Sequence, residues 1–262
     1  MARKVSPHPT TMTCLTHLRR AALVIPLAAA SLGAQTLTVS DITPGWQNVT
    51  GGTNVAIANS PADPITLRWG NSMGSGQSGY NFNDRATPFD VVLGPGGSAR
   101  FLLGRFTHLN RPIESGTSIS GAQLRVQMTI AGAAPTTFAE VFQLAHEETP
   151  NGADPCPYGG PNGSGVNAEG CADRVLVTSN ITADGFSFGG TQYFLRLLGF
   201  SSSNSSFVGA GDFLSAENGS NDAWLWAEIT TERPNIVPEP STYVLMATGL
   251  VGLGMLRRRR RA

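Results

Sequence analysis

The chain has 262 residues, and its 31 glycines, 17 prolines and 14% charged residues indicate many turns and a lightly charged surface. Its formal net charge of zero hides a segregation: nine of the 18 basic residues lie in the two tails, while all 18 acidic residues lie between Asp41 and Glu239. There they meet nine arginines and no lysine, which gives a formal charge of −9 and argues against nucleic acids and anionic lipid surfaces as partners, since both require a basic face.

The N-terminal segment carries the pattern of a secretory signal. Two arginines precede the apolar run Ala21–Leu32, and small residues follow it directly before Gln35. A basic flank, a short apolar core and small residues at the cleavage position are the three parts of a signal peptide. The run is also shorter than the about 20 residues that a membrane-spanning helix requires. We therefore assign residues 1–34 to a signal peptide with a helical core, translated from Met1 or from Met12.

From Gln35 onward, short apolar or β-branched runs alternate with clusters of Gly, Asn, Asp, Ser and Pro. In the run 123–130 every second residue is apolar, the pattern of a strand with one buried and one solvated face. The predicted strands are 36–39, 54–58, 65–69, 89–93, 100–106, 123–130, 137–143, 174–178, 192–198 and 223–230. A series of strands without intervening helices predicts an all-β domain over 35–230, an antiparallel β-sandwich or jelly roll.

Two cysteines, Cys156 and Cys171, remain in the body once the signal has been removed together with Cys14. An even pair in an exported chain predicts a disulfide. The segment between them is rich in Gly and Asn. Closing a loop of about 15 residues would stabilise the fold by roughly 3 kcal/mol, chiefly by restricting the unfolded chain. A metal–thiolate pair is the alternative, although neither cysteine has a Cys or His partner at zinc-finger spacing.

Oxygen-bearing side chains flank this loop. They are Glu147, Glu148, Asn151, Asp154 and Asp173. Hard oxygen ligands on a constrained loop are what Ca²⁺ requires, although their spacing matches no EF-hand. The sequence therefore offers a Ca²⁺ site formed by Glu147, Asn151, Asp154 and Asp173, with ordinary solvated loop polarity as the alternative.

Only two histidines, His108 and His146, lie in the body. They could form a joint metal pair, or they could anchor loops through hydrogen bonds, which is the commoner role. A Ser-His-Asp triad would have to use one of them, but no Gly-x-Ser-x-Gly sequence precedes a predicted helix.

Three glutamates, Glu140, Glu147 and Glu228, lie on or near predicted strands and are candidates for a paired-carboxylate glycosidase. Such sites carry aromatic side chains that stack on sugars. Trp224 and Trp226 alternate onto one face of a predicted strand, and we expect that face to belong to the core. We therefore expect a protein that is not an enzyme, with a glycan-active enzyme or a glycan-binding module as the alternatives.

Five short segments of the body carry a resemblance to a known family. They are Phe106–Ile113, His146–Asn151, Cys156–Pro157, Gly170–Val175 and Leu198–Phe200. These segments resemble the choice-of-anchor K domain family, over roughly residues 43–230. The resemblance implies an exported β-rich domain without assigned chemistry. One departure lies in the first segment, where the family's Phe-Thr-His usually continues with Asn-Asn and this chain has Leu109-Asn110.

The C-terminal segment has three parts in a fixed order after a polar linker, 231–237. The parts are the tripeptide Pro238, Glu239 and Pro240, an apolar run at 243–256, and the basic cluster Arg257, Arg258, Arg259, Arg260 and Arg261. Together, residues 238–261 resemble the PEP-CTERM sorting signal, which implies recognition and removal by an exosortase of the Gram-negative inner membrane. The apolar run predicts a short transmembrane helix whose basic end stays in the cytoplasm. A permanent single-pass anchor is the alternative.

These patterns predict a non-catalytic exported protein of the cell surface or extracellular matrix. Because PEP-CTERM systems are associated with exopolysaccharide-producing bacteria, the resemblance implies exopolysaccharide or biofilm as its setting. The expected partners are the exosortase, the inner membrane during transit, and exopolysaccharide. No cofactor other than Ca²⁺ is expected.

Overall fold

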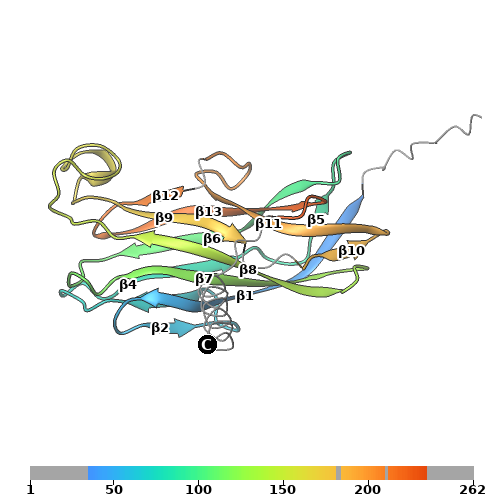
Figure 1. The fold of residues 1–262 in the computed structure, drawn as a ribbon, viewed down its shortest axis with the longest axis horizontal. Coiled ribbons are helices and arrows are strands. Elements are labelled where there is room, and N and C mark those ends of the chain that lie inside the picture. Colours follow the sequence, from blue (N-terminus) through green and yellow to red (C-terminus); the bar gives the residue numbers. More distant parts are fainter. Residues whose placement is uncertain (1–34, 181–183, 210–211, 235–262) are drawn as a thin grey trace, which may run out of the picture. The chain divides into compact units, whose positions relative to one another are not determined.

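The computed structural model describes residues 35–180, 184–209 and 212–234 of the chain, and these form two antiparallel β-sheets (Figure 1). In spatial order the six-stranded sheet contains β12 (Asp212–Ser215), β9 (Asp173–Asn180), β8 (Thr137–Glu147), β7 (Ile119–Ile130), β1 (Thr36–Gly51) and β5 (Phe89–Val92). The seven-stranded sheet contains β10 (Phe186–Phe188), β11 (Thr191–Ser201), β13 (Gly219–Thr230), β6 (Ala99–Asn110), β4 (Ser78–Asp84), β3 (Ile65–Trp69) and β2 (Ala56–Ala58). The prediction of an antiparallel all-β body is confirmed.

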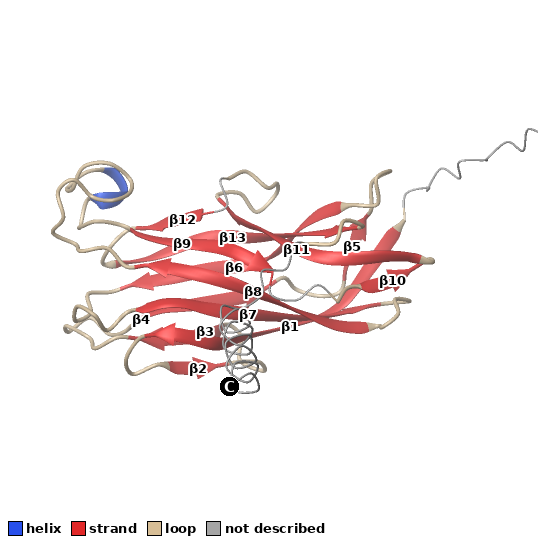
Figure 2. Ribbon diagram, viewed as in Figure 1, coloured by secondary structure: helices blue, strands red, loops and turns tan. Residues whose placement is uncertain are grey.

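Among the described residues, the regular structure outside the strands is one short 3₁₀ turn, η1 (Gly165–Asn167), which lies in the long loop between β8 and β9 (Figure 2). Within the described residues the structure contains no helix with the length and apolarity that membrane crossing requires. The signal helix predicted in 1–34 and the transmembrane helix predicted in 238–261 lie outside the described residues.

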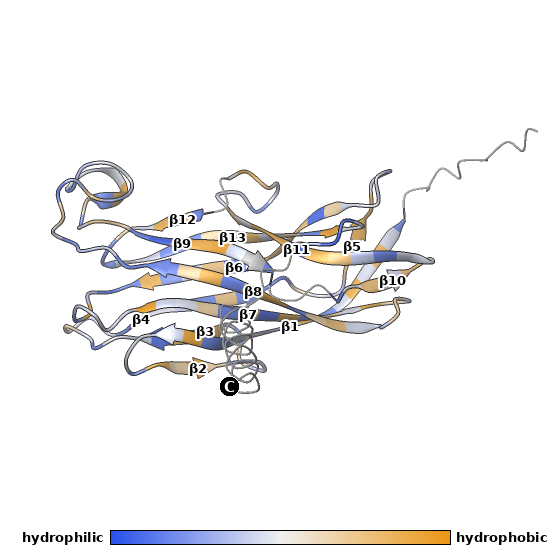
Figure 3. Cartoon of the chain, viewed as in Figure 1, coloured by the Kyte–Doolittle hydropathy of each residue, from blue (hydrophilic) through white to orange (hydrophobic). Residues whose placement is uncertain are grey.

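A single hydrophobic core joins the two sheets, because buried side chains from both belong to one cluster. Period-two alternation creates its inner faces, and hydropathy alternates along many of the strands (Figure 3). In β8 every second residue from Phe138 to His146 is buried. The same alternation that buries Phe142 and Leu144 therefore also brings Glu140 and His146 inward.

A β-bulge in β6 sets which of its side chains face the core. Leu225 of β13 pairs with Gly104, but Trp226 pairs with Leu102, so Leu103 is the extra residue. Buried side chains of the core fall at odd positions before the bulge and at even positions after it, because one inserted residue moves every later side chain to the other face. This shift turns His108 inward.

Three strands of the structure were not predicted from the sequence: β4, β10 and β12. β4 consists of small and polar residues around two buried aromatic side chains, Tyr80 and Phe82, and its Gly and Asn residues are depleted in strands generally. β10 and β12 are short strands at the edges of the two sheets. β1 is also much longer than predicted, because it continues through Pro44 to Gly51.

Candidate functional site

Five titratable residues meet where strands of both sheets end, and we call them the His–carboxylate cluster. They are His108, His146, Glu148, Asp173 and Glu217. His108 lies near the end of β6 in the seven-stranded sheet, whereas His146 and Asp173 lie in β8 and β9 of the six-stranded sheet. Glu148 follows β8, and Glu217 lies between β12 and β13. The cluster therefore spans the two sheets.

Potential ligand atoms lie close together in two overlapping groups. One atom each from His108, His146 and Asp173 lie within 4.8 Å of one another, and so do carboxylate oxygens of Glu148, Asp173 and Glu217. Asp173 belongs to both groups. Four of the five residues are buried, and Glu148 is the exposed one.

Both histidines are held through Nδ1. His146 Nδ1 shares a hydrogen bond of 2.7 Å with the Tyr80 hydroxyl, and His108 Nδ1 shares one of 2.8 Å with Ser215 Oγ. His146 Nε2 lies 3.3 Å from Glu148 Oε2, whereas the buried His108 Nε2 has no hydrogen-bond partner. Burial, together with the neighbouring His146, lowers the pKa of His108 well below its usual value, so this imidazole is neutral.

The buried carboxylates are only partly satisfied. Asp173 Oδ1 accepts a hydrogen bond of 2.8 Å from the Thr149 backbone N–H, but Asp173 Oδ2 has no partner. Neither carboxylate oxygen of Glu217 has a well-formed hydrogen bond, although nearby amides of Asn110 and Asn151 partly oppose the rise of its pKa. Desolvation, followed by repulsion from the Glu148 carboxylate, raises the pKa of both Asp173 and Glu217.

Aromatic side chains pack against both histidines. Trp69 stacks on His108 with ring centroids 5.8 Å apart and meets His146 edge-on at 5.2 Å. Trp69 and Tyr80 are fully buried. Burial raises the pKa of Tyr80 well above its usual value, so its hydroxyl stays protonated beside His146. These walls limit the rotation of both imidazole rings.

The loop between β8 and β9 contains the disulfide that was predicted from the sequence. Cys156 and Cys171 are bonded, and their Cα atoms lie 5.2 Å apart. Asn167 is buried within the loop, where its Nδ2 donates to the backbone oxygens of Tyr158 and Gly160. A buried amide thus supplies internal order that glycine content alone did not suggest.

The Ca²⁺ set proposed from the sequence is not gathered in the structure. Glu147 turns to Arg174, which donates to it from Nε at 2.8 Å and from Nη2 at 3.0 Å, and to the hydroxyl of Tyr158. Asp154 is exposed in the loop, outside both groups of potential ligands, whereas Asp173 lies in both. Glu147 and Asp154 are thus not grouped with Asp173, which instead joins Glu148, Glu217 and the histidines, while the Asn151 amide lies near Glu217.

The glutamates considered for glycoside hydrolysis lie apart in distinct surroundings. Glu228 is buried on β13 and pairs with Arg196 and with Arg100, whose Nε lies 3.6 Å from it. Glu140 is buried on β8 and accepts a hydrogen bond of 3.1 Å from the Gly185 backbone N–H. These two glutamates are thus on different sheets.

Trp224 and Trp226 share a strand face, but that face is not the core. The core members on β13 are Ala223, Leu225, Ala227 and Ile229. Trp226 is buried nonetheless, beneath a loop whose Ser203 backbone oxygen accepts a hydrogen bond of 2.9 Å from Trp226 Nε1. The expectation that these tryptophans belong to the core is corrected.

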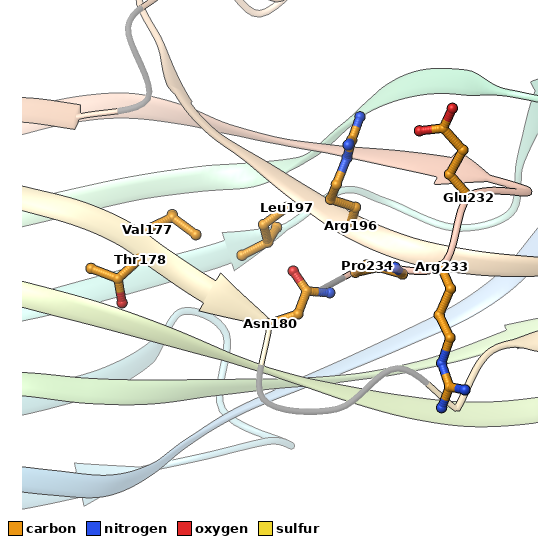
Figure 4. A pocket seen from close by; sticks show the side chains of 8 residues that line it. All are labelled: Val177, Thr178, Asn180, Arg196, Leu197, Glu232, Arg233 and Pro234. Atoms are coloured by element: carbon orange, nitrogen blue, oxygen red, sulfur yellow. The ribbon is translucent and has the colours of Figure 1, made fainter. Parts of the chain in front are cut away.

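An open groove lies elsewhere on the body, beside the ends of β9 and β13, with a volume of about 350 Å³ (Figure 4). Val177 and Asn180 line it from the end of β9, Arg196 from β11, and Glu232 and Arg233 from the segment after β13. Its lining is mostly polar, unlike the walls of the His–carboxylate cluster.

Comparison with known protein families identifies the C-terminal segment. Residues 237–261 match the family described as the PEP-CTERM protein-sorting motif. No curated protein matches the chain. The matched segment contains the tripeptide Pro238-Glu239-Pro240 and the five terminal arginines, which lie outside the described residues. The match indicates an exported protein that an exosortase sorts to the cell surface.

Proposed function

We propose that this chain is a non-catalytic protein of the surface or extracellular matrix of a Gram-negative bacterium, where its β-body is displayed after exosortase processing. The observation that carries the proposal is the sorting motif at 237–261, at the C-terminal side of an all-β body. In this proposal the protein passes through the inner membrane during export, and the exosortase is its processing partner.

For the body, we assign the choice-of-anchor K type of exported domain. In support of this assignment, three of the segments that carry the resemblance converge on one place. His108 comes from the first segment, His146 and Glu148 from the second, and Asp173 from the fourth. If these segments are the common motifs of the family, their meeting at one cluster is consistent with a structural core that family members share.

A non-catalytic role is supported by the surroundings of the glutamates. Glu228 is engaged by two arginines, and Glu147 is engaged by Arg174 and Tyr158. A carboxylate held in this way is poorly placed to act as an acid or nucleophile toward a glycan. Exopolysaccharide is the proposed setting of the displayed body, as a matrix rather than a substrate. The alternative is a glycan-binding module, for which a second groove, lined by Arg100, Leu102 and Trp226, is the place to look.

Mass spectrometry of the protein from its own host tests the sorting step. We expect a mature C-terminus at or near Pro238-Glu239-Pro240, with the arginine cluster absent. A variant that lacks Arg257–Arg261 should accumulate unprocessed while its body stays folded, because the basic cluster sets only the orientation in the membrane. A mature protein that still ends in the arginine cluster, or an unchanged ratio of the two forms in the deletion variant, would contradict the proposal.

A further inference from the structure

We propose that the His–carboxylate cluster is a structural metal site that binds one divalent transition-metal ion of the Zn²⁺ type through His108, His146 and Asp173, with Glu148 as the fourth ligand. This inference does not depend on the proposed function. It rests on unpaired buried atoms, on the orientation of the histidines and on the spacing of the ligand atoms.

The first argument is the concentration of unsatisfied buried atoms at this point. His108 Nε2 and Asp173 Oδ2 are buried without hydrogen-bond partners. Both residues are fully buried. Buried polar atoms are nearly always paired in folded proteins, and an unoccupied ion site is a recognised reason for an exception. A cation would satisfy lone pairs on nitrogen and oxygen at once.

The second argument is the orientation of the two imidazoles. A histidine that binds a metal usually uses its second ring nitrogen for a hydrogen bond, which fixes the ring. Here both Nδ1 atoms are engaged, by Tyr80 and by Ser215, so each ring has Nε2 left for a ligand. His146 Nε2 is already 3.3 Å from the Glu148 carboxylate. The Tyr80 and Ser215 hydroxyls are thus positioning groups rather than ligands.

The third argument is distance. One potential ligand atom each from His108, His146 and Asp173 lie within 4.8 Å of one another. Two ligand atoms that bind one tetrahedral Zn²⁺ at 2.0–2.2 Å lie about 3.3–3.6 Å apart. Shifts of less than about 1 Å in each side chain would therefore bring these three ligand atoms to coordinating distance of one ion.

The kind of ion follows from the ligand atoms. Ca²⁺ and Mg²⁺ prefer sites formed entirely by oxygen, whereas imidazole suits Zn²⁺ and its neighbours in the first transition row. Two neutral imidazoles with the carboxylates of Asp173 and Glu148 would also balance the charge of a divalent ion. Glu217 shares a group with both of these carboxylates and lies next to them rather than to the histidines.

Such an ion would join the two sheets. His108 belongs to the seven-stranded sheet, and His146 and Asp173 belong to the six-stranded one. Glu148 has a side chain that is 30% exposed, so it marks the side from which an ion enters. Four protein ligands with buried histidines are typical of a closed, structural site rather than a catalytic one.

The test uses the full chain, purified after export with its disulfide intact, treated with a chelator and then dialysed against buffered Zn²⁺. We expect one bound Zn²⁺ per chain, a zinc X-ray absorption spectrum with nitrogen and oxygen but no sulfur neighbours, and a higher unfolding temperature in the presence of Zn²⁺. Parallel dialysis against Ca²⁺ should leave the unfolding temperature unchanged.

Asp173→Asn is the informative variant, because it keeps the shape of the side chain and an oxygen that can accept from Thr149. It should weaken Zn²⁺ binding by at least about tenfold, as the loss of even an outer-shell group does. The metal-free variant should unfold no earlier than the metal-free wild type, since no hydrogen bond is lost. Asp154→Asn is the matched control, because Asp154 is exposed and lies outside the cluster, and it should leave Zn²⁺ binding unchanged.

Three outcomes would overturn the proposal. The first is wild-type protein that retains no Zn²⁺ after dialysis, and the second is a sulfur neighbour in the absorption spectrum. The third is equal Zn²⁺ binding by the Asp173→Asn and Asp154→Asn variants. If Asp173→Asn does not fold, the metal content and the absorption spectrum of the wild type decide the matter.

Discussion

Glu147 and Glu148 are neighbours in the sequence, but their side chains have different surroundings. Side chains of a strand alternate between its two faces, so at the end of β8 His146 points inward and Glu147 points outward to Arg174. A set of ligands chosen by proximity in the sequence therefore mixed the two faces. The alternation was readable, since His146 continues the buried series of Phe142 and Leu144.

His108 and Glu217 could not be placed from the sequence. The inward direction of His108 depends on the bulge at Leu103. The adjacent Gly104 is compatible with a bulge, but a glycine alone does not establish where the register shifts. Glu217 follows β12, a strand that was not predicted. A local sequence pattern does not show which distant elements lie next to each other in the fold.

The ion pair of Glu147 gives a prediction at the residue scale. Hydrogen bonds from Arg174 and then from Tyr158 lower the pKa of Glu147. Arg174→Gln should raise that pKa toward the usual range for glutamate, and Tyr158→Phe should raise it less. Because the pKa in the folded state lies below that in the unfolded state, the pair stabilises the fold above the unfolded-state pKa, and this contribution is lost as pH falls through the folded-state value.

A carboxyl NMR titration of Glu147 measures this effect directly. Arg125→Gln is the control, since Arg125 bonds to the amide of Gln127 rather than to a carboxylate. An unchanged pKa of Glu147 in Arg174→Gln would show that the pair does not persist in solution.

Among the elements, β1 shows why strand limits were underestimated. It contains Pro44 and Gly45, which usually mark turns, yet it continues to Gly51. β1 pairs with β7 from Val39 onward, while β5 pairs only with Thr36–Val39. The part of β1 after Val39 therefore has one open edge, where a proline is tolerated.

The side chain of Asn59 takes the place of a neighbouring strand at this open edge. Its Oδ1 accepts from the Trp46 backbone N–H at 2.7 Å, and its Nδ2 donates to the Trp46 backbone oxygen at 3.0 Å. A long-range contact of this kind cannot be read from a local pattern, which is why the start of the strand was predicted but its full length was not.

The contact between β4 and β6 gives a prediction at the element scale. A Cβ atom added at Gly104 would lie 2.3 Å from the Asn83 backbone oxygen and 2.6 Å from the Phe82 ring. Gly104→Ala should therefore destabilise the protein by roughly 1–3 kcal/mol through overpacking. Gly96→Ala is the control, because nothing lies within 4 Å of its added Cβ, and it should change stability by no more than about 0.5 kcal/mol. Equal urea midpoints for the two variants would contradict this account of the contact.

For the whole molecule, the sequence was sufficient for the class of fold but not for its topology. Period-two runs such as 123–130 indicate strands with one buried face, and burial of that face requires a second layer. Which strands neighbour one another depends on contacts between distant residues, such as the pairing of β1 with β5 and β7. The two sheets were therefore foreseeable, and their strand order was not.

The disulfide gives a prediction for the stability of the whole body. Cys156 and Cys171 are separated by 15 positions, and Cys156→Ser should lower the free energy of unfolding by about 3 kcal/mol, mainly by releasing the unfolded chain. Both sheets should keep their circular dichroism signal. A reducing agent should lower the stability of the wild type to that of the variant and leave the variant itself unchanged. Wild-type protein that is insensitive to the reducing agent would refute a stabilising role for the bond.

The position of β13 has a mechanical consequence. β13 is the last strand among the described residues, and it lies inside its sheet, between β11 and β6. A pull on the C-terminal end of β13 would load this strand along its axis against antiparallel neighbours on both sides. Rupture in this shear geometry requires many ladder hydrogen bonds to fail together, whereas a strand at the edge of a sheet could peel away one bond at a time. The last strand of the described body is thus held on both sides against such a pull.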